Sequence, residues 1–433
     1  MSVPQTRQRC ASCGHELSDT DAHTRCPRCQ GLLELHHPEP TGGGAELARL
    51  FDQRLAVRTG PHASGVWRFS EVVLPAASGD IVSYPEGNTP LLQRAAVAEW
   101  AGVSELLLKH EGLNPTGSFK DRGMTVGVTQ ARRVGATAVA CASTGNTGAS
   151  LAAYAALAGL PAVVIVPQGQ VAIGKMAQAL AYGARTLVVR ANFDRCLELA
   201  DEASERLGVY LLNSINPFRL EGQKTIVLEL LQQLGWEPPD WILVPAGNLG
   251  NTAAFGKALS EARRWGMIGR VPRLGAVQAA GAAPFSAGFH EAFVRRHRVE
   301  PHTLATAINI GNPASWDRAV RAIRETDGVV TDVSDDEILE AKAVVDGCGV
   351  GCEPASAASV AGARRLAREG VIRPGERVVA VLTGHVLKDP AAVTRYHVET
   401  APPPPRANRP VEIEPSLEAI VAALQVTARH LRS

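Results

Sequence analysis

The sequence lacks the features that would direct attention to nucleic acids, membranes or the cell exterior. Its 44 Lys and Arg residues balance 43 Asp and Glu residues, and a formal net charge of +1 gives no electrostatic reason to expect a polyanion or a charged membrane as partner. The first thirty residues contain arginines and cysteines and no apolar run typical of a secretory signal peptide. We therefore expect a cytoplasmic protein that acts on small molecules, with no nucleic-acid or membrane partner.

Charged side chains are also absent from residues 134–174, a stretch long enough to suggest a membrane helix. Turn-forming residues interrupt this stretch, among them Gly145, Gly159, Pro161 and Pro167. They divide it into a strand, a loop, a short Ala-rich helix and a second strand. Because a parallel strand covered by helices on both faces is continuously apolar, we interpret the stretch as a buried βαβ unit.

Two nucleotide-binding motifs are missing from the glycine-rich turn at residues 245–252, which follows an apolar strand. Gly247 and Gly250 do not have the full dinucleotide-binding spacing, and no Walker lysine and hydroxyl follow them. This argues against NAD and against nucleoside triphosphates. The backbone N–H groups of such a turn, at the start of a helix, can still hold a smaller phosphate.

Four of the eight cysteines have the spacing of a metal site, in two Cys-x-x-Cys pairs separated by twelve residues: Cys10, Cys13, Cys26 and Cys29. Four thiolates favour a tetrahedral Zn²⁺ and leave no open coordination position, so the ion is expected to be structural. The alternative is a pair of redox or disulfide couples. A polar segment of thirty residues has little core without a metal, and a reducing compartment disfavours disulfides.

Short apolar segments alternate with helix-length periodic segments along most of the chain. We expect strands at 105–110, 138–142, 162–166, 186–189, 209–212, 241–244, 273–277 and 377–382. Such alternation is typical of an α/β fold, here with two helix-flanked, mostly parallel sheets. We divide the chain into a zinc ribbon (1–35), a linker and lead-in segment (36–85), a main region (86–396) with a smaller subdomain inserted at about 130–220, and a proline-rich tail with a terminal helix (397–433).

Lys120 lies in the hydroxyl-rich turn Asn114–Gly123, between an expected strand and an apolar helix pattern. A Schiff-base lysine is presented in this way, beside backbone N–H groups that can hold an anion. The loop Ser143–Gly148 has a similar place after its strand and suits a carboxylate or a phenolic oxygen, although an N-capping loop without a ligand would have the same residues. Thr383 ends the strand 377–382, where ligands of α/β sheets bind.

Together these segments supply a reactive lysine, a phosphate cradle, a loop for a carboxylate and a hydroxyl for a ring nitrogen. These are the requirements of pyridoxal phosphate bound to an amino acid. The chain resembles the threonine synthases, within the tryptophan-synthase-β-like family of pyridoxal-phosphate enzymes, which has fold type II. The resemblance runs from about Glu86 to Pro390 and rests on these segments and on the runs 86–91, 111–123, 213–225, 353–358 and 383–390.

The resemblance implies a role for each matching residue. Lys120 would carry the cofactor and act as acid and base, Asn146 would contact the 3′ oxygen, and Thr383 would face the pyridine nitrogen. The cofactor phosphate would be held by Gly247, Asn248, Leu249, Gly250 and Asn251. Ser143, Thr144 and Thr147 would bind the substrate carboxylate. Asn216, Arg219 and Lys224 would bind the substrate phosphate, since expulsion of phosphate requires cations and donors.

The implied reaction converts O-phosphohomoserine and water to threonine and phosphate, in a homodimer. Within the same fold, the alternatives are a cysteate-synthase-like β-replacement on phosphoserine and a threonine or serine dehydratase. A dehydratase has no use for Arg219 and Lys224 facing its ligand. A more distant alternative is a zinc-ribbon interaction module on an inactive scaffold, and the intact set around Lys120 disfavours it.

Overall fold

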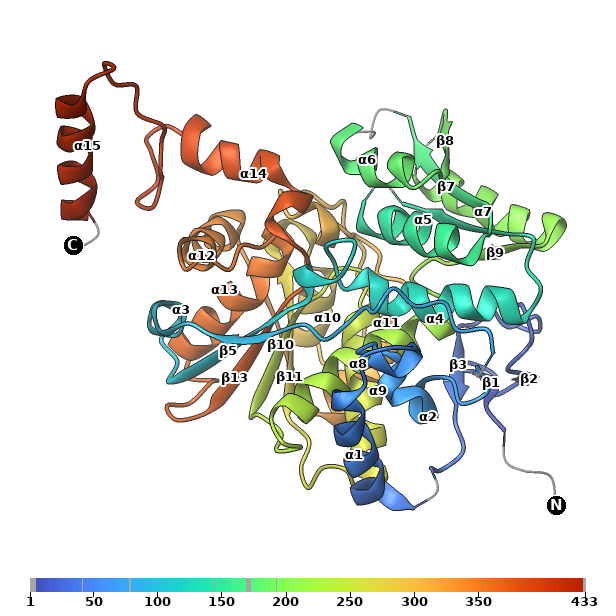
Figure 1. Cartoon of the computed structure of the whole chain (residues 1–433). Helices are drawn as coiled ribbons and strands as arrows, with labels where there is room; N and C mark the ends of the chain where they lie inside the picture. Colours follow the sequence, from blue (N-terminus) through green and yellow to red (C-terminus); the bar gives the residue numbers. More distant parts are fainter. Residues whose placement is uncertain are drawn as a thin grey trace. The chain divides into compact units, whose positions relative to one another are not determined.

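Two sheets with mostly parallel strands form the centre of the structure, a computed structural model that describes residues 5–40, 42–77, 79–143, 145–168, 173–191 and 193–430 (Figure 1). The larger sheet contains β4 (Leu91–Gln93), β5 (Glu105–His110), β10 (Trp241–Pro245), β11 (Arg273–Ala279), β12 (Val329–Val333) and β13 (Arg377–Leu382). Their order is β12-β11-β10-β13-β5-β4, and only the edge strand β4 is antiparallel to its neighbour.

The smaller sheet is entirely parallel, in the order β8-β7-β6-β9. Its strands are β6 (Ala138–Ala142), β7 (Ala162–Pro167), β8 (Arg185–Val189) and β9 (Val209–Leu211). All eight strands expected from the sequence are therefore confirmed, within two residues at each end. The strand β12 was not expected, because its five residues include Thr331 and Asp332 and lack a continuous apolar run.

Helices cover both faces of each sheet. They are α1 (Gly43–Gln53), α2 (Ser70–Val73), α3 (Ala95–Ala101), α4 (Lys120–Arg133), α5 (Asn146–Ala158), α6 (Ile173–Ala181), α7 (Phe193–Leu207), α8 (Pro217–Gln233), α9 (Gly250–Arg264), α10 (Pro284–His290), α11 (Trp316–Glu325), α12 (Asp335–Gly347) and α13 (Pro354–Arg368). On β10, Ile242 and Val244 pack with α8, α9 and α11, whereas Trp241 and Leu243 pack with α12 and α13. Alternate residues thus enter two separate cores, which explains why these strands are continuously apolar.

The smaller sheet is covered in the same way. Val139 and Val164 pack with α4, α5 and α6, and Ala140 and Ile165 pack with α7 on the other face. Within the stretch without charges, β6, α5 and β7 therefore form the βαβ unit that its glycines and prolines indicated. Within the described part of the chain, no helix is both long and apolar enough to cross a membrane.

The N-terminal segment forms a separate antiparallel sheet of three strands, β1 (Arg7–Cys10), β2 (Glu16–Ser18) and β3 (Leu33–His36), in the order β2-β1-β3. We call residues 7–36 the cysteine ribbon. Its own core contains only Cys10, Cys26 and Leu33, with Leu17 packed against them. So small a core cannot hold thirty residues together without a further cross-link.

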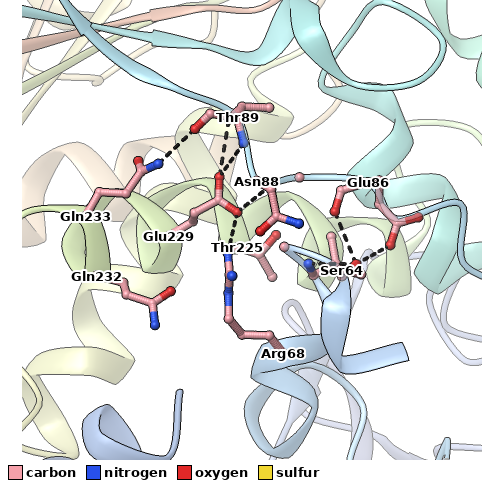
Figure 2. Close-up of polar contacts among 12 residues, drawn as sticks. Ser64, Arg68, Glu86, Asn88, Thr89, Thr225, Glu229, Gln232 and Gln233 are labelled. Carbon is pink, nitrogen blue, oxygen red and sulfur yellow. Dashed lines mark hydrogen bonds and ion pairs between the residues drawn. The ribbon is translucent and has the colours of Figure 1, made fainter. Parts of the chain in front are cut away.

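A buried carboxylate, Glu229 on α8, connects segments that are far apart in the sequence (Figure 2). It accepts hydrogen bonds from the backbone N–H groups of Asn88 and Thr89 at 2.8 and 3.0 Å, and it pairs with Arg68 at 2.9 Å. Lys109 and Arg122 complete the network at 2.6 and 2.7 Å. Burial alone would raise the pKa of Glu229, but the three cations hold it well below its usual range.

The chain divides into two compact units, Met1–Asp389 and Pro390–Ser433. The second unit contains α14 (Pro390–Thr394) and α15 (Leu417–His430). The terminal helix expected after the polyproline stretch is therefore confirmed.

Candidate active site

One large cavity of about 1580 Å³ lies at the carboxyl ends of strands from both sheets. Most of the residues predicted for cofactor and substrate line it: Lys120, Ser143, Asn146, Thr147, Gly247, Asn248, Leu249, Gly250, Asn251 and Thr383. Thr144 lies outside the described residues. A binding site at the carboxyl edge of parallel strands is the expected place in an α/β fold.

Lys120 is the first residue of α4 and is half-buried in the cavity wall. Its Nζ lies 4.2 Å from the centre of the Phe119 ring. Burial, and next the positive charge of Arg219, lower its pKa from 10.5 to about 7, while Glu353 acts in the opposite direction. A substantial fraction of the Lys120 amine is therefore neutral near pH 7, as a nucleophile and base requires.

The turn from β10 into α9 approaches the cavity with its backbone. Leu249 has φ +63°, in the left-handed region, and this turns the following N–H groups of α9 toward the loop. A Cβ on Gly247 would lie 2.9 Å from the Cα of Ile308, so a side chain does not fit there. The Asn248 side-chain oxygen accepts a hydrogen bond from the Ala314 N–H at 3.3 Å, which fixes the loop.

Three buried polar atoms around this turn have no hydrogen-bond partner among the described residues: Gln223 Oε1, Asn251 Oδ1 and Thr252 Oγ1. Buried polar atoms are rarely left unpaired, and a group of them beside a glycine turn at a helix N-terminus indicates a ligand. The Thr252 hydroxyl and, with the opposite amide orientation, the Gln223 and Asn251 side chains can donate to a phosphate. These residues fit the phosphate of pyridoxal phosphate.

A second loop, between β6 and α5, also lines the cavity. Ser143 Oγ accepts a hydrogen bond from the Gly145 N–H at 3.2 Å, and α5 begins at Asn146. Ser143 and Thr147 both line the cavity. Their hydroxyls and the free N–H groups of the first turn of α5 suit a carboxylate.

Asn146 donates from Nδ2 to both oxygens of Glu353, at 3.3 and 3.0 Å. Burial raises the pKa of Glu353, and the hydrogen bond from Asn146 lowers it, as do the charges of Lys388 and Lys120. Sequence reasoning assigned no role to Glu353. It stands before Pro354 at the start of α13, where an acidic residue is ordinary helix capping, and only the fold brings it to Asn146.

Thr383 directly follows β13 and is almost fully buried. Its Oγ1 lies 3.0 Å from Ser356 Oγ, which also accepts a hydrogen bond from the Gly384 N–H at 2.8 Å. Ser356 therefore fixes the orientation of the Thr383 hydroxyl at the cavity wall. Sequence reasoning missed Ser356 because a serine inside an Ala-rich helix has no distinguishing signal.

The three residues predicted to bind the substrate phosphate do not line the cavity. Asn216 caps α8 by accepting from the Phe218 and Arg219 N–H groups, and Lys224 pairs with Glu221 at 2.5 Å and with Glu261 at 2.7 Å. The side chains of Asn216 and Lys224 thus bind other residues of the protein. Arg219 differs, because its Nε and Nη2 are buried and have no partner among the described residues. Contact of these residues with a substrate stays a prediction.

The four N-terminal cysteines lie together, and all four Sγ atoms are within 4.8 Å of one another. Cys10 and Cys29 are 3.4 Å apart, and Cys13 and Cys26 are 3.7 Å apart. Zn–S bonds of about 2.3 Å in a tetrahedron place the sulfurs about 3.8 Å apart, so this cluster fits a zinc ion. The sulfurs are too far apart for disulfides, which need about 2.05 Å.

Comparisons with known proteins identify the family of this chain. The family described as "Pyridoxal-phosphate dependent enzyme" matches residues 82–384. Threonine synthase from Methanocaldococcus jannaschii is 44% identical over 398 residues, covering 90% of this chain and 95% of that protein. Threonine synthase from Methanosarcina acetivorans is 45% identical over 387 residues, covering 89% of this chain and 93% of that protein.

The fold agrees as well. The crystal structure of threonine synthase from Escherichia coli superposes with a TM-score of 0.68 at 20% identity, covering 97% of this chain and all of that one. The prediction of an α/β fold of type II is therefore confirmed. With 44% identity over nearly the full length of a curated relative, the chain belongs to the threonine synthase family of pyridoxal-phosphate-dependent enzymes.

Proposed function

We propose that this enzyme converts O-phosphohomoserine and water to L-threonine and inorganic phosphate. The observation that carries the choice of substrate is the Arg219 guanidinium, buried with two unpaired nitrogens and close enough to Lys120 to lower its pKa. Arg219 does not line the cavity, but a buried cation with unused N–H groups whose charge reaches the reactive amine supports a substrate that carries a phosphate. A dehydratase acting on serine or threonine would have no need for it.

Pyridoxal phosphate, when bound, withdraws electrons from the substrate so that C–H bonds at Cα and Cβ can break. Gly247 to Asn251, with Thr252, would hold its phosphate, Asn146 would donate to its 3′ oxygen, and Thr383 would face its ring nitrogen. Lys120 would carry the cofactor. The Glu353 carboxylate holds Nδ2 of Asn146 and so orients the side-chain amide that would make this contact.

The residues of the chain divide the remaining tasks. Ser143, Thr147 and the N-terminus of α5 orient the substrate carboxylate, and Thr144 would join them. The neutral amine of Lys120 accepts the proton at Cα, and its lowered pKa of about 7 raises the unprotonated fraction of that amine near neutral pH. Arg219 stabilises the charge of the departing phosphate. Asn216 and Lys224 would contribute through α8, because Asn216 caps its first turn and Lys224 pairs with Glu261 of α9.

A second candidate function uses the same lysine and loops, namely β-replacement on phosphoserine, in the manner of cysteate synthase. It also requires a cation for the phosphate, so Arg219 does not separate the two. An end-point assay does: the holoenzyme is given O-phosphohomoserine, and threonine and phosphate are quantified against Lys120→Ala. Equal release of both products, absent in the variant, supports the proposal. If the cofactor absorbance is present but no threonine forms, the substrate is wrong. The enzyme would then be assayed with phosphoserine and sulfite, and next with serine and threonine.

We further propose that the cysteine ribbon binds a structural Zn²⁺ through Cys10, Cys13, Cys26 and Cys29, and that the enzyme is a cytoplasmic homodimer without nucleic-acid or membrane partners. The small ribbon core and the four clustered sulfurs support the zinc. The division into ribbon (1–35), lead-in (36–85), catalytic region (86–396) and tail (397–433) is likewise proposed. Metal analysis and sedimentation of the purified holoenzyme test the zinc and the dimer.

A further inference from the structure

The cysteine ribbon lines the same cavity as Lys120. Ser12, Arg25, Gln30, Gly31 and Leu32 form part of its wall. All five belong to the two turns that carry the metal-site cysteines. The candidate zinc site is therefore not a remote appendage, because its turns face the space where cofactor and substrate are expected.

The turn after Cys26 fixes this part of the wall. The Cys26 N–H donates to the Gly31 carbonyl at 2.9 Å, and the Gln30 N–H donates to the Cys26 carbonyl at 2.8 Å. Arg25 forms a β-bridge with Leu32, and its Nη1 donates to the Gln30 carbonyl at 3.2 Å. The Arg25 guanidinium is thus held over the turn and does not extend freely into solvent.

The ribbon is itself fixed to the rest of the enzyme by ion pairs. Glu34 on β3 pairs with Arg321 of α11 at 2.5 Å, and Asp19 pairs with Arg133 of α4 at 2.8 Å. His37, directly after β3, lies 2.9 Å from Glu221 of α8 and is buried. Because α4 begins at Lys120 and α8 carries Arg219, the ribbon has a defined position relative to the reactive amine.

Arg25 keeps its charge available. Among the residues that the structure describes, no carboxylate forms an ion pair with Arg25, and its one hydrogen bond goes to a neutral carbonyl. Arg28, three residues later, is exposed and does not line the cavity. A cation in the wall of a cleft raises the local concentration of an anionic substrate and its association rate.

We propose that the cysteine ribbon is a wall of the substrate cleft and that Arg25 attracts the phosphate group of the substrate as it enters. The proposal rests on the proposed function, since it requires a phosphorylated substrate. Arg25 acts on entry and not on chemistry, so its loss changes kcat/KM and leaves kcat unchanged. The attraction is electrostatic, so it weakens as ionic strength rises.

The test compares holoenzyme variants Arg25→Gln and Arg28→Gln with the unchanged enzyme. At low ionic strength, Arg25→Gln is expected to lower kcat/KM for O-phosphohomoserine by roughly threefold to tenfold, and the difference is expected to shrink in high salt. Arg28→Gln should match the unchanged enzyme. Calorimetric titration with inorganic phosphate supplies a readout independent of turnover: Arg25→Gln should bind phosphate several-fold more weakly.

Equal kinetics and equal phosphate affinity in both variants would overturn the proposal. Zinc content and melting temperature show whether Arg25→Gln has disturbed the turn. If it has, Arg25→Lys decides, because lysine keeps the charge and loses the fixed contact to Gln30. Recovery of phosphate binding in Arg25→Lys supports the role of charge, and failure to recover refutes it. If the unchanged enzyme does not consume O-phosphohomoserine, the proposed function itself has failed.

Discussion

The side-chain amide of Asn146 donates to the carboxylate of Glu353, with Nδ2 3.0 Å from Oε2, and so connects the first residue of α5 to the N-cap of α13. The helix α5 packs against the smaller sheet and α13 against the larger one. This one contact therefore sets the orientation of the amide that is expected to meet the cofactor oxygen.

Replacement of this carboxylate tests its positioning role. Glu353→Gln keeps the volume and one carbonyl acceptor but removes the charge that holds Asn146. We expect kcat to fall by roughly tenfold to a hundredfold, with the cofactor still bound but its visible absorbance maximum shifted. Glu369→Gln, at the exposed end of the same helix, should leave both unchanged. An unaltered spectrum in Glu353→Gln would contradict the role.

Cofactor loading should depend on pH through Lys120. Its pKa of about 7 lies below that of an ordinary lysine, so the neutral amine becomes more abundant as pH rises through 7. The rate at which cofactor-free enzyme acquires visible absorbance from added pyridoxal phosphate should rise roughly tenfold between pH 6 and 8. Because the charge of Arg219 contributes to the shift, Arg219→Gln should move the midpoint to higher pH. Arg132→Gln, exposed on α4, serves as the control.

Loss of a metal ligand should weaken the attachment of the ribbon. Cys26→Ser is expected to abolish bound zinc and lower the melting temperature by several degrees, because the small ribbon core depends on the metal. Cofactor absorbance should persist, since none of the four cysteines lines the cavity. Cys348→Ser, outside the cluster, should retain its zinc by elemental analysis. Loss of absorbance together with zinc would show that the ribbon is needed for the active site to form.

Removal of the buried carboxylate Glu229 should be severely destabilising. Glu229→Gln leaves Arg68, Lys109 and part of the Arg122 charge without a buried counter-charge. We expect the free energy of unfolding to fall by about 3 to 5 kcal/mol. Glu237→Gln, exposed after α8, should change it little. Chemical denaturation of the two variants gives the comparison, and equal midpoints would be inconsistent with the network.

The sequence predicted the features that local patterns determine. Short apolar segments that alternate with helix-length segments predicted the strands. The glycine-containing turns after β6 and β10 predicted the two loops that line the cavity. The two Cys-x-x-Cys pairs predicted the cysteine cluster, because the spacing of such metal ligands is visible within a few residues of sequence. Each of these depends on residues within one or two turns of chain.

Other features depend on contacts that no local pattern encodes. Glu353 reaches Asn146 across 207 positions, and Arg68 reaches Glu229 across 161. The ionic bonds of Lys224 could not be foreseen either, since Glu261 belongs to the next helix. Nor does any motif place Arg25 in the wall of the cavity that Lys120 lines, because the ribbon and the catalytic loops come together only through tertiary packing.

The network around Glu229 also constrains the order in which this chain can fold during translation. Arg68, Lys109 and Arg122 leave the ribosome long before Glu229 does, and burying their charges without a partner is costly. The turn at Asn88 and Thr89 likewise waits for the same carboxylate to accept its N–H groups. The nascent segment that carries Lys120 therefore reaches its native packing only after α8 has been synthesised.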